Sequence, residues 1–310
     1  MPSLQALSQR LKSVTSTARL TKTMKVVASV KLKVAQRTME AARPFGASTS
    51  VLADVLTPGE EDEAPESKLI VPITSDRGLC GGVNSYIIKD VKKFHAENPE
   101  NASTLIIGSK GVPGLGRTHG ELISTSIDET YQQPVSFSLA SFLAEQILAS
   151  PQQEYTILYN KFRSVINFEP TPIVIKGPEA LGASGVLDEF EFEGEKEEVR
   201  DRAAPPRPPA ARPAARRPLP PRAPDPPLTP LPPPLPQVLA DMYQFNLATT
   251  IYACLLENIT CEQASRMTAM DNASNNAGEV ISKLTLQYNR QRQAVITTEL
   301  TEIVAGAESV

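Results

Sequence analysis

The chain has 310 residues, 41% of them hydrophobic, and a formal net charge of −4 at pH 7. That length suits one large domain or two modest ones, and the mild charge gives no general signal for nucleic-acid binding. The chain has three cysteines, and their spacing is not that of a disulfide scaffold. Its two histidines lie far apart in the sequence, which argues against a His-based metal site or a Ser-His-Asp triad. No apolar run reaches the length of a membrane span.

Residues 1–57 are predicted to form one long helix with a coiled-coil seam. Apolar residues recur in alternating steps of three and four, and Pro44 is expected to bend the helix. The helix is strongly basic, since Glu40 is its only acid before residue 54. This face is either solvated or binds an acidic partner. The seam begins with Leu4, Leu7, Leu11, Val14 and Ala18, and the basic residues are Arg10, Lys12, Arg19, Lys22, Lys25, Lys31, Lys33, Arg37 and Arg43.

Residues 68–187 read as an α/β domain. Strands are expected at 68–75, 103–108, 154–162 and 171–176, and helices at 81–97 and 134–150. Because helices alternate with strands, the sheet should be largely parallel.

The segment "TSDRGLCGGVN" joins the first strand to the first helix of this domain. Cys80 could be a nucleophile there, but neither histidine is predictably close enough to act as its base. Glycines at 78, 81 and 82 instead fit a tight turn, whose exposed side could bind a partner. A second glycine-rich stretch, "GSKGVPGLGRTHG", does not match the dinucleotide-binding motif, and no clear helix with an acidic residue at the required distance is expected to follow it.

Residues 188–237 read as a linker, first acidic and then rich in proline and arginine. Residues 202–236 hold 16 of the 28 prolines of the chain, so this part is predicted to be disordered or polyproline II. It is either a ligand for proline-binding domains or an insertion without a structural role.

Residues 238–310 are predicted to form a second long helix, which pairs antiparallel with the first helix as a coiled coil. Its seam shifts register once, by a stutter. Cys254 and Cys261 are too far apart along one helix for an easy disulfide. The first series is Met242, Phe245, Thr249, Tyr252, Leu256 and Ile259, and the second is Met267, Met270, Ser274, Ala277, Ile281, Leu284, Tyr288, Gln291 and Val295.

Three stretches together resemble the γ subunits of F-type ATP synthases, the rotary central stalk. They are "LTKTMKVVASVKLKVAQ", "TSDRGLCGGVN" and the ending "RMTAMDNASNNAG…LQYNRQRQAVITTELTEIVAGA". The family's C-terminal motif is matched by Ile296, Thr297, Glu299, Glu302, Gly306 and Ala307. The resemblance covers nearly the whole chain outside residues 202–236.

The resemblance implies a long antiparallel coiled coil plus a central Rossmann-like α/β domain, the foot. It implies a rotor shaft inside an α3β3 hexamer, with the foot on the c-ring and on δ- and ε-type stalk subunits. Such a subunit is not itself an enzyme, holds no cofactor, and binds no nucleic acid. The positions that match the family's contacts with β are Met24, Lys25, Asp76, Arg77, Cys80, Arg266, Arg292, Gln293 and Thr297.

A shaft that slides past three β subunits should lack a sticky apolar exterior, so the last turns of the chain are expected to be polar. No Arg- and Ser-rich transit peptide is recognised ahead of the first helix, so either an import sequence was removed, or the sequence starts late, or the source is bacterial. The source is expected to be mitochondrial, at the matrix side of the inner membrane, or else bacterial, at the cytoplasmic side of the plasma membrane. Asn-x-Ser/Thr matches at Asn101, Asn258 and Asn272 are expected to be without a role. The alternatives are a nucleotide-dependent α/β enzyme with helical extensions and a coiled-coil scaffold that binds nucleic acid.

Overall fold

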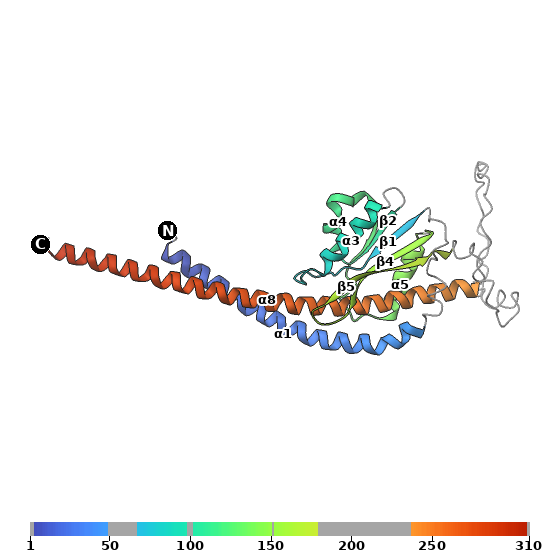
Figure 1. Ribbon diagram of the computed structural model, residues 1–310, viewed down its shortest axis with the longest axis horizontal. Helices are drawn as coiled ribbons and strands as arrows, with labels where there is room; N and C mark the ends of the chain where they lie inside the picture. Colours follow the sequence, from blue (N-terminus) through green and yellow to red (C-terminus); the bar gives the residue numbers. More distant parts are fainter. Residues whose placement is uncertain (1–2, 49–66, 98–101, 151, 179–236, 309–310) are drawn as a thin grey trace, which may run out of the picture.

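The computed structural model describes residues 3–48, 67–97, 102–150, 152–178 and 237–308. Two long helices, α1 (Leu4–Ser48) and α8 (Gln237–Glu308), lie side by side, and an α/β domain sits on one end of the pair (Figure 1). Both predicted terminal helices are therefore present, and α1 continues through Pro44. The predicted residues 49–57 and the linker 188–236 lie outside the described residues.

The sheet has five strands in the order β3-β2-β1-β4-β5. The strands are β1 (Lys68–Pro72), β2 (Ala102–Ile107), β3 (Ile123–Ile127), β4 (Glu154–Phe162) and β5 (Phe168–Lys176). The first four pair in parallel, and β5 pairs antiparallel with β4. The largely parallel α/β sheet predicted from the sequence is confirmed.

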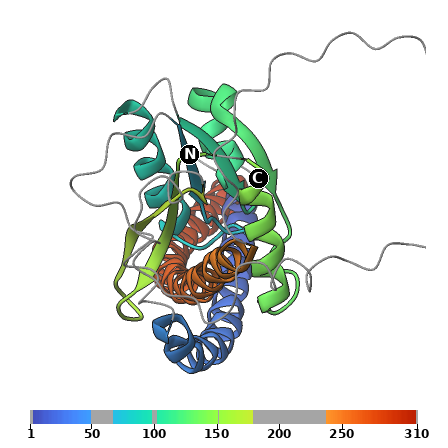
Figure 2. The ribbon, with the colours of Figure 1, turned by 90° about the vertical axis from the view of Figure 1, so that its right-hand side faces the viewer.

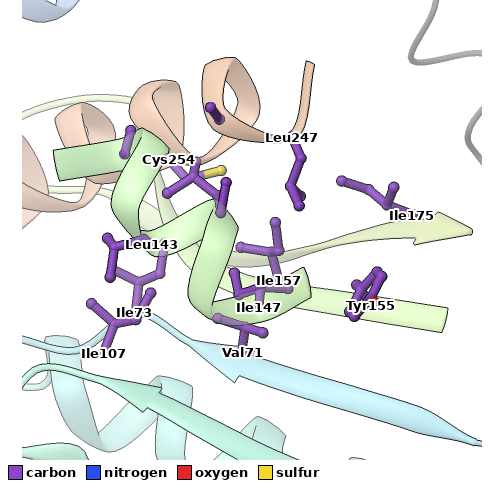
Figure 3. Close-up of a cluster of buried hydrophobic side chains, with 14 of the residues drawn as sticks. Val71, Ile73, Ile107, Leu143, Ile147, Tyr155, Ile157, Ile175, Leu247 and Cys254 are labelled. Atoms are coloured by element: carbon purple, nitrogen blue, oxygen red, sulfur yellow. The ribbon is translucent and has the colours of Figure 1, made fainter. Parts of the chain in front are cut away.

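Helices cover both faces of this sheet. On one face, α3 (Val83–Glu97) and α4 (Gly111–His119) pack on Ile70, Ile106 and Leu158. On the other face, α5 (Phe137–Leu148) and the first half of α8 pack on the alternate residues of the same strands. Figure 3 shows this second core, whose members include Val71, Ile73, Ile107, Leu143, Ile147, Ile157, Leu247 and Cys254.

The glycine-rich stretch 108–120 does contain a helix, α4, and the short turn η1 (Gly120–Leu122) and strand β3 follow it. In the described residues after it no α-helix directly follows the stretch, in agreement with the expectation, but α4 inside it was not among the predicted elements. Glycine and proline lower helix propensity, but here the glycines allow close packing. A Cβ atom on Gly111 would lie 2.5 Å from Ile106, and one on Gly114 would lie 2.3 Å from Ile88. Pro113 falls in the first turn, where the missing N–H has no helical partner in any case.

Helix α8 lies between α1 and the α/β domain (Figures 1 and 2). Most of its side chains from Tyr243 to Arg266 are buried, because the helix packs against the sheet on one side and against α1 on the other. From Asn272 to Gln291 exposed residues alternate with covered ones, and the covered ones include the seam residues Ala277, Ile281 and Leu284. One helix therefore serves as core of the domain and then as one strand of the coiled coil.

Candidate functional site

The coiled-coil seam follows the predicted heptads on α1 and over the second series on α8, whereas Met242 and Phe245, which begin the predicted first series, are exposed. On α1, Leu7, Ala28, Leu32 and Met39 are buried, and the residues at the intervening seam positions are half-buried. On α8, all but the last member of the predicted second series are buried or half-buried, and Val295 is 39% exposed. The basic residues of α1 lie on its outer face and are exposed, apart from Lys25, which is half-buried.

Lys25 occupies a seam position, where heptads normally place apolar residues. Its Nζ lies 2.7 Å from Oδ1 of Asp271 on α8, which forms an ion pair between the two helices. The neighbouring Met24 is half-buried. Of these two predicted partner-binding residues, Lys25 therefore already has a partner of opposite charge within the chain.

The predicted turn after β1 is a tight backbone loop that ends at α3. Leu79 and Gly81 have positive φ values of 62° and 63°, and glycine adopts such values without strain. The Asn84 side chain closes the loop, since its Oδ1 accepts from the Ser75 N–H at 2.9 Å and its Nδ2 donates to Ser75 Oγ at 2.8 Å. The exposed residues of the turn are Arg77, Gly78, Leu79 and Gly81.

Cys80 points into this loop and is only 3% exposed. Its sulfur contacts Asn84 Nδ2 at 3.3 Å and lies 3.6 Å from Ser75 Oγ. The two histidines of the chain stack on each other, with ring centroids 5.4 Å apart, and burial, followed by the nearby His119, lowers the pKa of His95. The Cys80 side chain is therefore buried inside the turn, where its sulfur contacts polar groups of the loop itself.

Asp76 also turns toward the domain. One carboxylate oxygen accepts from the N–H groups of Ser109, at 3.1 Å, and Glu129, at 3.2 Å, and the other accepts from the Tyr131 N–H at 3.1 Å. These donors follow β2 and β3, so Asp76 joins the carboxyl ends of the first three strands.

Arg266 lies on α8 beneath the same turn. Its guanidinium donates to Glu262 Oε1 at 2.6 Å and to the Gly78 carbonyl at 3.4 Å. Burial raises the pKa of Glu262, and the charge of Arg266 opposes that shift. Ser265 donates to the Cys80 carbonyl at 2.7 Å. The turn and α8 thus form one unit.

The far end of α8 projects beyond the N-terminus of α1 (Figure 1). Every described side chain from Arg292 to Ala307 is exposed, over a length of about 24 Å. Arg292, Gln293 and Thr297 lie together here, and Thr297 Oγ1 donates to the Gln293 carbonyl at 2.9 Å. The expectation of polar last turns was wrong, because the exposed residues of the projecting end include Val295, Ile296, Leu300, Ile303 and Val304.

The nine predicted partner-binding residues therefore fall into three places: Met24 and Lys25 on the coiled coil, Asp76, Arg77, Cys80 and Arg266 at the turn, and Arg292, Gln293 and Thr297 on the projecting end. The sequence analysis did not identify Asp271 and Glu262, the two carboxylates that form ion pairs with the predicted partner-binding residues Lys25 and Arg266. The i, i+4 spacing of Glu262 and Arg266 on one helix would have revealed the second pair.

The sheet has a topological switch between β1 and β4, the place where open α/β sheets commonly bind ligands. Here α8 fills that place. Asn258 of α8 accepts from Asn160 Nδ2 of β4 at 2.9 Å, and Ser265 reaches the segment after β1. In the described part of the chain, no three His, Cys, Asp or Glu side chains are grouped to hold a metal, and no helix is long and apolar enough to cross a membrane.

Comparison with known proteins gives consistent matches along the whole chain. A family model described as ATP synthase matches residues 3–310. The ATP synthase gamma chain of Pelagibacter ubique is 34% identical, with all of both chains covered. The mitochondrial ATP synthase subunit gamma of Ipomoea batatas is 33% identical, over 99% of this chain and 85% of that protein.

A solved structure is also similar. It is a chain in the central stalk and c-ring of the Tetrahymena thermophila mitochondrial ATP synthase, with a TM-score of 0.61 and 28% identity. The match covers 82% of this chain and 99% of that one. Similarity thus extends from sequence to the arrangement of helices and sheet.

Proposed function

The chain belongs to the family of ATP synthase γ chains, and from that premise we propose how its parts serve the complex. It is the central rotor shaft of an F1Fo ATP synthase, which couples proton-driven rotation of the membrane ring to ATP synthesis and hydrolysis on the β subunits. The observation that carries this function is α8, which runs without a break from the core of the α/β domain to the exposed end of the coiled coil.

In this proposal the chain makes and breaks no bonds itself. The α8 helix fills the switch-point crevice, and Cys80 is buried inside the turn, which together support a non-catalytic coupling subunit. The nucleotide-dependent enzyme is the weaker alternative for the same reason. The nucleic-acid scaffold is weaker because the whole chain matches γ chains.

The partners follow from the position of each part. One copy would lie in an α3β3 hexamer, with the α/β domain on the c-ring and beside the δ- and ε-type stalk subunits. Exposed Arg77, Arg292, Gln293 and Thr297, together with Met24, Lys25 and Arg266, would meet β subunits, and Asp76 and Cys80 would hold the turn that presents Arg77. Mitochondrial relatives favour a mitochondrial location. Within it, the proposal places the chain at the matrix side of the inner membrane, as a peripheral subunit.

Coupling requires contacts that differ between rotational states. The outer face of α1 supports this requirement, because its exposed lysines and arginines can pair with acidic groups of one β subunit at one angle and lose them at the next. Each exposed pair contributes about 0.2–1 kcal/mol, so no single angle becomes a deep trap.

Reconstitution tests this function. Purified α and β subunits of the same source are assayed for particle size and ATP hydrolysis with and without this chain. We expect one copy to bring three α and three β subunits together and to activate hydrolysis. A chain that neither joins the ring nor changes its activity, with or without residues 202–236, would contradict the proposal.

A further inference from the structure

We propose that a chain of buried hydrogen bonds through Asn258 carries rotation from the α/β domain into α8. This inference rests on the rotor function proposed above and names the residues of the joint between foot and shaft. The joint must resist sideways displacement, because torque enters through the domain and leaves through the helix.

Asn258 is fully buried on α8 and binds two separate segments of the domain. Its Oδ1 accepts from Asn160 Nδ2 of β4 at 2.9 Å, and its Nδ2 donates to the Tyr131 hydroxyl at 3.1 Å. One turn further, Cys261 Sγ donates to the Asn160 carbonyl at 3.3 Å. The side chain is therefore held from two directions, by a strand and by the segment between β3 and α5.

The second bond continues into the rest of the sheet. The Tyr131 N–H donates to Asp76, which also accepts from Ser109 and Glu129. Through two side chains, Tyr131 and Asp76, α8 is thus connected to the carboxyl ends of β1, β2 and β3, while Asn160 connects it to β4. Asn258 is thus connected to all four parallel strands, and Cys261, Ser265 and Arg266 of the same helix make further bonds to the domain.

Hydrogen bonds suit this task better than the apolar contacts around them. Apolar burial has no preferred direction, so a helix can slide or rotate slightly on an apolar surface at small cost. A hydrogen bond weakens steeply with distance and angle, and a buried group that loses its partner finds no water to replace it. Asn258 lies beside the apolar Cys254 and Leu255. If packing were the sole requirement at this position, a leucine would meet it.

The test uses the assembled complex and the isosteric change Asn258→Leu. The α3β3 ring is fixed to a surface, a bead is attached to the α/β domain, and the angular fluctuation of the bead is recorded while the motor waits for ATP. We expect wider fluctuation than in the unmodified complex. We also expect a lower ratio of ATP synthesis to ATP hydrolysis, because hydrolysis needs only the shaft inside the ring.

The matched control is Thr260→Val, two residues further along α8. Thr260 is also buried, and its hydroxyl donates within the helix to the Leu256 carbonyl at 2.8 Å. Both changes remove buried hydrogen bonds, but only Asn258→Leu cuts the link to the sheet. Backbone amides of β4 should exchange about tenfold faster in Asn258→Leu, which corresponds to roughly 1.4 kcal/mol, and should be unchanged in Thr260→Val.

If Asn258→Leu and Thr260→Val changed the bead fluctuation and the ratio of synthesis to hydrolysis equally, the inference would be overturned. Equal changes would mean that any lost buried hydrogen bond loosens the protein around α8. The absence of any effect of Asn258→Leu would also overturn the inference. If that variant fails to assemble, Tyr131→Phe takes its place. It removes only the bond between Asn258 and Tyr131, so we expect the same changes in fluctuation and in the ratio, and unchanged exchange in β4. Failure of the unmodified chain to assemble with α and β would instead contradict the rotor function itself.

Discussion

Lys25 of α1 and Asp271 of α8 form an ion pair across the coiled-coil seam, with Nζ and Oδ1 2.7 Å apart. Both side chains are about two-fifths exposed, so solvent screens the pair. The pair matters for the register of the coiled coil. A charged residue at a seam site fixes how the two helices align along their length, since a slip of one helix along the other separates the charges.

A double-mutant cycle measures this pair. Lys25→Gln, Asp271→Asn and the double variant are compared by urea unfolding. We expect a coupling free energy of about 0.2–1 kcal/mol, which shrinks as salt is added. If the two single variants changed the free energy of unfolding additively at low salt, the two charges would not interact in solution.

Leu284→Asp should disrupt the coiled coil. The Leu284 side chain is 6% exposed in the seam, and its loss together with burial of a carboxylate should lower the free energy of unfolding by about 2–5 kcal/mol. The matched control is Leu286→Asp, since Leu286 is 72% exposed. Thermal unfolding followed by circular dichroism checks both variants, and equal transitions for the two would refute the seam assignment.

Arg292→Ala together with Gln293→Ala should leave folding intact, because both side chains are exposed on the projecting end of α8. In the assembled enzyme we expect ATP synthesis to fall by about two- to fivefold, as loss of about 0.4–1 kcal/mol of contact at the rate-limiting angle predicts. The control is Arg290→Ala, an exposed arginine nearby outside the predicted set. Unchanged synthesis in the double variant, or an equal loss in the control, would argue against these contacts.

Stability of the α/β domain should depend on pH through His95. Burial, followed by the charge of the neighbouring His119, lowers the pKa of His95 below its ordinary value of 6.5. The unfolded chain then takes up the proton more readily than the folded one, so this part of the stability is present above pH 6.5 and is lost as the pH falls below it.

Urea unfolding at about pH 7.5 and at about pH 5.5 measures the loss. The variant His119→Gln lacks the neighbouring imidazole charge. The free energy of unfolding should therefore differ less between the two pH values in this variant than in the unmodified chain. A difference that stays the same in this variant would show that the stacked pair contributes nothing to it.

Deletion of residues 202–236 should leave assembly with α and β intact. The prediction rests on composition, since this segment carries no apolar periodicity that a core would require. Size-exclusion chromatography of the complex with and without the segment gives the answer. Loss of the complex on deletion would reveal a role in binding.

Sequence patterns predicted the long helices because their signals are local and repeated. Heptads from Leu4 onward and the series from Met267 give the seam without knowledge of the rest of the fold. Helix α4 escaped prediction because Gly111 and Gly114 oppose helix formation locally, and their advantage, close contact with Ile106 and Ile88, exists only in the folded domain.

The site was predicted less completely for a similar reason. A motif can point to Asp76, Cys80 and Arg266, but only the fold shows that these side chains bond inward, and that Arg77 and Leu79 form the exposed surface of the turn. Asn258 matched a glycosylation pattern in the sequence, yet it is fully buried. Residues that act through partners far away in the chain leave no local pattern.

The place of α8 in the core of the α/β domain has a consequence for synthesis of the protein. The face of the sheet that carries Val71, Ile107 and Ile157 is completed by Leu247, Ile251 and Leu255, which leave the ribosome long after the strands. Until then, among the described helices, α5 alone packs on that apolar face. The core of the domain is therefore incomplete until the last quarter of the chain has been synthesised. During that interval the exposed apolar face of the sheet is prone to aggregation and requires protection in the cell.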